Sequence, residues 1–195
     1  LMQHGLPAEL TLVPLIESGY RPRAESPQGA VGLWQFMPET GRQFGLKRSL
    51  WYDGRRDIIA STQAALDYLE HLNKRFDGDW LLTLAAYNCG PSRVRRAIGK
   101  SNTRNYWEVA ADLPTETRKH VSKLLAAIQI VGDPMRHGVA LQPIPNVPIV
   151  TEFDLGGPIA LKYLTAVEGW SVDKFEELNP AFNREYTDPE GPFGI

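Results

Sequence analysis

Residues 57–90 read DIIASTQAALDYLEHLNKRFDGDWLLTLAAYNCG. Asp57 and Asp79 each precede a run with apolar residues at helical spacing, and an aspartate side chain accepts hydrogen bonds from the free N–H groups of a first helical turn. Gly90-Pro91 ends the second run and allows another helix to begin. The apolar positions of the first run are Ile58, Ile59, Leu66, Leu69, Leu72 and Phe76. This stretch predicts consecutive helices.

The segments on either side extend the helical pattern. Apolar residues recur at helical spacing up to Glu17, and Pro14 inside that run predicts a kink or a weakened turn. Short helices are expected over residues 29–36 and from Pro38 onward. Residues 115–131 place apolar side chains on one helix face, namely Val121, Leu124, Leu125 and Ile128. An all-α domain is therefore expected over residues 1–132.

The composition changes after Gly132. Prolines make residues 133–149 a connector that cannot form a regular helix. Beyond it, a short strand near residues 149–153 and two helices, over 158–167 and 172–178, are expected. The third predicted part is thus a small α+β appendage over residues 150–195. A unit of roughly 50 residues is marginal alone, so we expect it to pack on the helical part or to be cut short.

Composition and charge exclude several classes of protein. Hydrophobic residues make up 43% of the 195 residues, which excludes disorder as the main state. The net charge of −2 lacks the basic excess of a nucleic-acid binder. Cys89 is the one cysteine, so no internal disulfide forms. No apolar run approaches the roughly 20 residues of a membrane span. Since the sequence starts with Leu1, we expect it to begin inside a longer precursor, so the lack of a visible signal peptide is not evidence for the cytoplasm.

Three short segments carry the candidate chemistry. Glu17 ends an apolar helix and precedes Ser18-Gly19, so its carboxyl group is expected at the core edge, where a general acid works well, although most glutamates are solvated surface residues. Gly32-Leu33-Trp34-Gln35 places a glycine beside an aromatic ring and leaves room for a flat group; the alternative is a core tryptophan. Ala86-Tyr87-Asn88-Cys89-Gly90 offers polar groups at a helix end; the alternative is a helix C-cap.

Together these segments resemble the ordered motifs of the lysozyme-like lytic transglycosylases, which are Glu-Ser, Gly-Leu-Met-Gln and Ala-Tyr-Asn-Ala-Gly. Residues 17–45, with Pro38-Glu39-Thr40-Gly41, are most similar to the subgroup of membrane-bound lytic murein transglycosylase D. The resemblance covers about residues 5–131. It implies an all-α, goose-lysozyme type catalytic domain that cuts peptidoglycan between N-acetylmuramic acid and N-acetylglucosamine and leaves 1,6-anhydro ends.

The resemblance also implies roles for individual residues. Glu17 matches the single catalytic acid/base, and Ser18 a residue near its carboxylate. Gln35, Tyr87 and Asn88 match residues of the sugar cleft. No metal or organic cofactor is implied, and Asp77-Gly78-Asp79 is too short for a calcium loop. The expected protein is a monomer of the bacterial periplasm, bound to the membrane, as an outer-membrane lipoprotein for example, by a segment outside this sequence.

Two positions depart from the family pattern. Cys89 replaces an alanine and is expected to act as a small hydrophobe. His120 stands where the family has a tyrosine near the catalytic centre. It is either a tolerated polar substitute at the cleft wall or a histidine that hydrogen-bonds Glu17 or the substrate and adds its own pH dependence.

The residues from about 150 onward allow two interpretations, and the function of the whole chain allows three. Residues from about 150 onward resemble a worn LysM carbohydrate-binding module, in Pro158-Ile159-Ala160, Trp170-Ser171-Val172-Asp173 and Glu177-Leu178-Asn179-Pro180. The alternative is a purely structural appendage. For the whole chain, a lysozyme-like muramidase that uses water and a non-catalytic glycan-binding protein are the alternatives to a lytic transglycosylase.

Overall fold

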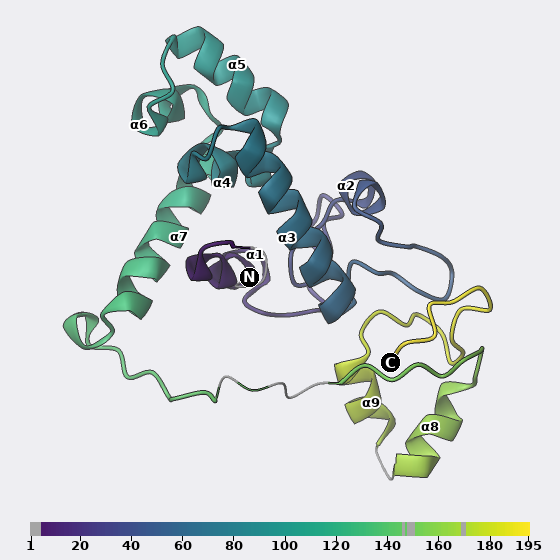
Figure 1. Cartoon of the computed structure of the whole chain (residues 1–195). Helices are drawn as coiled ribbons and strands as arrows, with labels where there is room; N and C mark the ends of the chain where they lie inside the picture. The colour runs from purple at the N-terminus through teal and green to yellow at the C-terminus, as the bar shows by residue number, and fades with distance from the viewer. Residues whose placement is uncertain (1–4, 146, 148–150, 169–170) are drawn as a thin grey trace. The chain divides into compact units, whose positions relative to one another are not determined.

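The computed structural model describes residues 5–145, 147, 151–168 and 171–195 (Figure 1). The chain divides into two units, each built from two separate stretches of sequence. The first unit contains Leu1–Ile16 and Ala65–Leu141, and the second contains Glu17–Ala64 and Gln142–Ile195. These units do not follow the expected boundaries at residues 132 and 150, and the division into a catalytic domain, a connector and an appendage stays a prediction.

The first unit is helical and is centred on α4 (Trp80–Cys89). Five consecutive residues of α4, from Leu82 to Ala86, are buried, as in a helix that is surrounded by protein. Helix α4 contacts α5 (Pro91–Ser101) and α7 (Thr115–Gly132), as Figure 1 shows. The remaining elements of this unit are η2 (Ala8–Leu12), α1 (Val13–Ser18) up to Ile16, most of α3 (Ile58–Arg75), α6 (Tyr106–Val109), η3 (Ala110–Asp112) and η4 (Met135–His137).

The predicted helix starts are confirmed. The Asp57 carboxylate accepts a hydrogen bond from the Ala60 N–H at 2.7 Å at the start of α3. Asp79 caps α4 in the same way, with a distance of 3.0 Å to the Leu82 nitrogen. The run that contains Pro14 forms two short elements, because the 3₁₀ turn η2 ends at Leu12 and α1 (Val13–Ser18) follows. Pro14 lies in the first turn of α1, where a proline is tolerated.

The helix expected over residues 29–36 is wrong. Val31 and Phe36 instead face each other in an antiparallel bridge, with both N–H to O distances at 3.1 Å. Gly32 and Gln35 between them have positive φ angles of 89° and 51°, which no right-handed helix accommodates. We call residues 29–36 the Gly32 turn. A helix does begin at Pro38 as predicted, and α2 covers Pro38–Gln43.

The C-terminal segment (residues 151–168 and 171–195) contains α8 (Leu161–Glu168) and α9 (Val172–Leu178), close to the two predicted helices. Its described residues pair through isolated bridges, one between Asp154 and Gly194. Part of the strand expected near 149–153, and Trp170 of the LysM-like pattern, lie outside the described residues. The α+β character of this segment stays a prediction, while the mostly helical class is confirmed for the chain.

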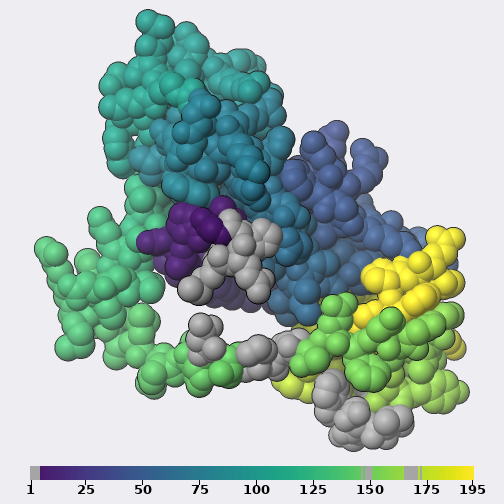
Figure 2. All heavy atoms as spheres, viewed as in Figure 1, coloured from purple at the N-terminus to yellow at the C-terminus, as the bar shows by residue number. Residues whose placement is uncertain are grey.

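The C-terminal segment is fastened to residues 47–56, which we call the 47–56 loop. The Asp53 N–H donates to the Ala181 carbonyl at 2.9 Å, and the Asn183 N–H donates to the Trp51 carbonyl at 2.7 Å. Figure 2 shows the yellow C-terminal residues against the blue residues near position 50. Buried Asp188 accepts a hydrogen bond from the Ser49 hydroxyl at 2.6 Å and lies 3.2 Å from the Lys47 ammonium. The segment is therefore built into the second unit.

Replacing Asp188 with alanine is expected to destabilise the protein by about 1–3 kcal/mol, because Ser49 and Lys47 lose a buried partner. A thermal melt followed by circular dichroism measures this as a midpoint several degrees lower. Asp173→Ala, which removes an exposed carboxylate of α9, is the matched control and should change the midpoint little. Equal midpoints for the two variants would show that the Asp188 contacts do not hold the segment.

Candidate active site

Glu17 and Ser18 form the end of α1. Glu17 is half-buried and Ser18 is buried. The Ser18 hydroxyl donates to the Leu33 carbonyl at 2.8 Å and accepts from the Arg21 N–H at 3.2 Å. Its single proton is therefore used inside the protein, and Ser18 ties the backbone next to Glu17 to the Gly32 turn.

The Gly32 turn is filled by protein. A Cβ atom on Gly32 would lie 1.8 Å from the Arg55 carbonyl oxygen, so the space beside this glycine is occupied by backbone. Trp34 is buried, and its indole N–H donates to the Thr62 hydroxyl at 2.9 Å. The expected opening for a flat group is wrong here, and the alternative of a core tryptophan is confirmed.

Gln35 is held by the same turn. Its amide nitrogen donates to the Gly32 carbonyl at 2.9 Å and to the Ala24 carbonyl at 3.2 Å. These bonds stabilise a residue with a left-handed backbone, a conformation that costs a non-glycine residue free energy. The side-chain oxygen is the group that Gln35 can offer to a ligand.

A buried ion pair between Arg55 and Asp53, which no local sequence pattern indicates, supports the turn. Arg55 donates to both carboxylate oxygens of Asp53, at 2.9 and 2.7 Å, and to the carbonyls of Gly29 and Phe36, at 2.9 and 3.2 Å. Burial favours neutral Asp53, but the hydrogen bonds and positive charge of Arg55 outweigh it and hold the pKa of Asp53 below its usual value. The guanidinium thus clamps both ends of the Gly32 turn.

Replacing Arg55 with methionine is expected to cost about 3–5 kcal/mol of stability near neutral pH, because it leaves Asp53 charged and buried. A carboxyl with a lowered folded pKa contributes stability above the unfolded pKa of about 3.9, and this contribution is lost as the pH falls through the folded pKa. The difference between parent and variant should therefore shrink below about pH 4. Denaturant titrations across this pH range measure it.

Arg48→Ala is the matched control for this experiment. The Arg48 guanidinium lies 3.8 Å from the same Asp53 carboxylate, but its side chain is 63% exposed. Exposed pairs contribute about 0–1 kcal/mol. A loss as large for Arg48→Ala as for Arg55→Met would contradict the assignment of the clamp to Arg55.

The other predicted site residues lie in the first unit, on α4 and α7. The Thr117 hydroxyl donates to the Asn88 side-chain oxygen at 2.8 Å, which leaves the amide nitrogen of Asn88 as the group to offer a ligand. His120 lies one turn further along α7 and is buried. The Tyr87 ring packs on Tyr68 of α3, with a centroid distance of 5.4 Å. Thr117 was missed, since no sequence pattern marks its contact with Asn88.

Helix α4, which carries Tyr87 and Asn88, ends at Cys89. Gly90 is its C-cap and has a φ of 87°, whereas Asn88 lies inside the helix. Cys89 is half-buried, and burial raises the pKa of its thiol. A thiol with a raised pKa is a poor nucleophile at neutral pH, as expected for a small packing residue.

The predicted residues thus form two groups. Glu17, Ser18 and Gln35 belong to the second unit, while Tyr87, Asn88 and His120 belong to the first. Within the described part of the chain, no three His, Cys, Asp or Glu side chains come together as metal ligands. No helix there has both the length and the apolar character needed to cross a membrane.

Comparison with known sequences links the chain to enzymes of the bacterial cell wall. Residues 1–110 match the family model of the transglycosylase SLT domain. The chain is 39% identical over 194 residues to the membrane-bound lytic murein transglycosylase D of Escherichia coli (strain K12), which covers 97% of the chain and 42% of that relative. It is 32% identical over 116 residues to the soluble lytic murein transglycosylase of the same strain. This match covers 56% of the chain and 18% of that relative.

Solved structures of similar fold are also lytic transglycosylases. An inactive Glu→Gln mutant of the lytic transglycosylase Slt from Pseudomonas aeruginosa covers 76% of the chain, with a TM-score of 0.56 and 27% identity. The 70 kDa soluble lytic transglycosylase from Escherichia coli covers 66%, with a TM-score of 0.54 and 28% identity. The chain spans 24% and 22% of these two structures.

Proposed function

The chain belongs to the transglycosylase SLT domain family, and we propose that its activity is the lytic cleavage of peptidoglycan glycan strands. The resemblance drawn from the three motifs, including that to the transglycosylase D subgroup, is confirmed by this membership. The observation that carries the activity is 39% identity over 97% of the chain to a murein transglycosylase. Because the chain spans 42% of that relative, the activity of the whole protein is part of the proposal.

Glu17 is the proposed acid and base. Most glycosidases need two carboxylates, one of which activates water or forms a covalent intermediate. One suffices when the nucleophile is the C6 hydroxyl of the sugar itself. Glu17 protonates the glycosidic oxygen, and the bond from C1 to that oxygen breaks. The positive charge at C1 is shared with the oxygen of the N-acetyl group. The Glu17 carboxylate then takes the proton of the C6 hydroxyl, whose oxygen bonds to C1 and closes the 1,6-anhydro ring.

The other predicted residues take supporting roles in this proposal. The resemblance places Ser18 near the Glu17 carboxylate, as a substrate-binding residue. Its hydroxyl bonds favour a positioning role instead, since they fix the backbone next to Glu17. Gln35, through its side-chain oxygen, and Asn88, through its amide nitrogen, are proposed to bind the glycan together with Tyr87 and His120. The histidine is either a polar wall residue or a partner of Glu17 or the substrate.

We also propose where the protein acts. Its substrate lies in the bacterial envelope, and the first of the relatives above is named membrane-bound. A periplasmic monomer held at the outer membrane by a lipoprotein anchor outside this sequence fits both facts. For the C-terminal segment, the LysM-like carbohydrate-binding interpretation is the one we propose, with a purely structural role as its alternative.

Mass spectrometry of digested murein tests the function. A transglycosylase leaves anhydro ends, which are lighter by one water molecule than the reducing ends left by a muramidase. Anhydro ends in the products are the expected result. Reducing ends would identify a muramidase, and binding without cleavage a glycan-binding protein; either result overturns the proposal.

A further inference from the structure

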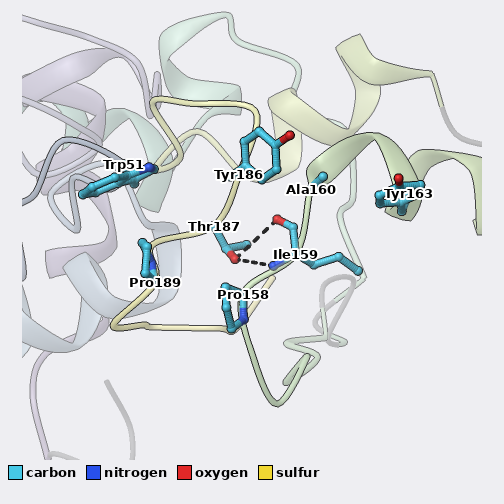
Figure 3. A pocket seen from close by; sticks show the side chains of 8 residues that line it. All are labelled: Trp51, Pro158, Ile159, Ala160, Tyr163, Tyr186, Thr187 and Pro189. Carbon is cyan, nitrogen blue, oxygen red and sulfur yellow. Dashed lines mark hydrogen bonds between the residues drawn. The ribbon is translucent and has the colours of Figure 1, made fainter.

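A pocket of about 470 Å³ lies within the second unit, between the 47–56 loop and the C-terminal segment (Figure 3). None of the proposed catalytic and cleft residues lines it, whereas Pro158, Ile159 and Ala160 of the LysM-like pattern do. The lining residues are Trp51, Pro158, Ile159, Ala160, Tyr163, Tyr186, Thr187 and Pro189. Trp51 lies inside the stretch matched by the transglycosylase family model, and the other seven lie beyond it. The pocket is therefore formed by one residue of the family-matched stretch together with residues of the C-terminal segment.

The walls of this pocket are fastened to each other. The Thr187 hydroxyl accepts a hydrogen bond from the Ile159 N–H at 2.9 Å and donates to the Ile159 carbonyl at 3.5 Å, as the dashed lines of Figure 3 show. The Leu161 N–H donates to the Glu185 carbonyl at 2.8 Å, and Ala160 and Tyr186 form a bridge. On the opposite wall, the Trp51 carbonyl is held by Asn183. The pocket is preformed, so a ligand does not have to order it.

Three aromatic side chains line the pocket and stay partly open to solvent. Tyr163 on α8 is 58% exposed and Tyr186 is 55% exposed, while Trp51 is intermediate. Exposed aromatic rings lose the stabilisation that burial provides, and gathered at one concave site they indicate a ligand. No ionisable acid, lysine, arginine or histidine is among the lining residues. The one cation recorded over a lining ring is the Lys162 ammonium, 5.2 Å from the centroid of the Tyr163 ring. Between Trp51 and Tyr186 the lining suits a neutral ligand with an apolar face and polar edges.

A pyranose ring has these properties. Its axial C–H groups form an apolar face that packs on the electron-rich face of an aromatic ring, and its hydroxyl and amide groups reach polar tips such as a tyrosine O–H or the indole N–H. The volume falls in the range of about 300–1,000 Å³ that small-molecule sites occupy. We propose that this pocket binds an N-acetylhexosamine unit of a glycan strand, with Trp51 and Tyr186 as its aromatic walls. The identity of the sugar rests on the proposed function.

The test uses the full chain in a Glu17→Gln background, so that glycan is not cut, with the soluble tetramer of N-acetylglucosamine as probe. Titration is followed by two-dimensional NMR of backbone amides and indole N–H groups, and Trp51→Phe identifies the indole signal of Trp51. The Trp51 indole and the Thr187 amide should shift. Trp51→Ala and Tyr186→Ala should each weaken the binding reported by the Thr187 amide about tenfold, whereas Trp51→Phe retains most of it.

Phe153→Ala is the matched control, because Phe153 is 68% exposed in the same unit and does not line the pocket. It should bind the probe as the parent does. An unshifted Thr187 amide, or unchanged affinity in both alanine variants, overturns the proposal. If murein digestion gives anhydro products but the Thr187 amide and the Trp51 indole do not shift with the probe, the sugar site is overturned and the proposed function stands. A shifted pocket in a protein that does not cut murein would remove the proposed function and keep the sugar site.

Discussion

Glu17→Gln is expected to lower murein cleavage by about 10²–10⁴-fold, the loss typical of a missing general acid or base. Glutamine has the shape of glutamate but cannot transfer a proton. Because the same group performs both proton transfers in the proposed mechanism, no second carboxylate compensates. The inactive Slt mutant from Pseudomonas aeruginosa also carries a Glu→Gln substitution, which shows that one glutamate is essential in that relative.

The measurement is the rate of anhydro product formation from purified murein, together with a thermal melt. Glu9→Gln, which changes an exposed glutamate of η2, is the matched control and should keep the parent's rate. A folded Glu17→Gln protein with a rate within tenfold of the parent would show that another group carries the proton.

The features that were predictable from sequence are the ones encoded by neighbouring residues. The caps at Asp57 and Asp79 bond to N–H groups three residues away, so a short window of sequence contains both partners. Glu17 was singled out because its position at the end of an apolar run is also local. The helical class of the first unit follows from the same kind of pattern.

The features that were missed depend on residues far apart in sequence. The Gly32 turn was expected to be a helix because a window of residues 29–36 does not contain Arg55, whose guanidinium and backbone determine its shape. The bond between Thr117 and Asn88 joins residues 29 positions apart. The aromatic pocket combines Trp51 with residues after position 157. Tertiary contacts of this kind override local propensity.

These long-range contacts connect the fold to the chemistry. Arg55 clamps the Gly32 turn, the Leu33 carbonyl in that turn accepts the Ser18 hydroxyl, and Ser18 adjoins Glu17. A change at Gly32 therefore disturbs the backbone next to the proposed catalytic carboxylate as well as the core. Stability and activity should fall together when this glycine is replaced.

Gly32→Ala is expected to cost more than about 4 kcal/mol, a large share of the 5–15 kcal/mol that stabilises a typical domain. The added Cβ would lie 1.8 Å from the Arg55 carbonyl oxygen and 2.7 Å from its carbon. Both atoms are backbone, so no side-chain rotation relieves the clash, and the φ of 89° is strained for alanine. We expect little soluble folded protein, with urea denaturation of the recovered fraction as the measurement.

Gly29→Ala separates the clash from the strain. Gly29 lies in the same turn with a φ of 84°, but nothing lies within 4 Å of its added Cβ. Its loss should therefore be limited to the backbone strain, about 1–3 kcal/mol. The excess loss in Gly32→Ala then measures the contact with Arg55. If the two variants lose equal stability, the close contact between the Gly32 and Arg55 backbones is contradicted.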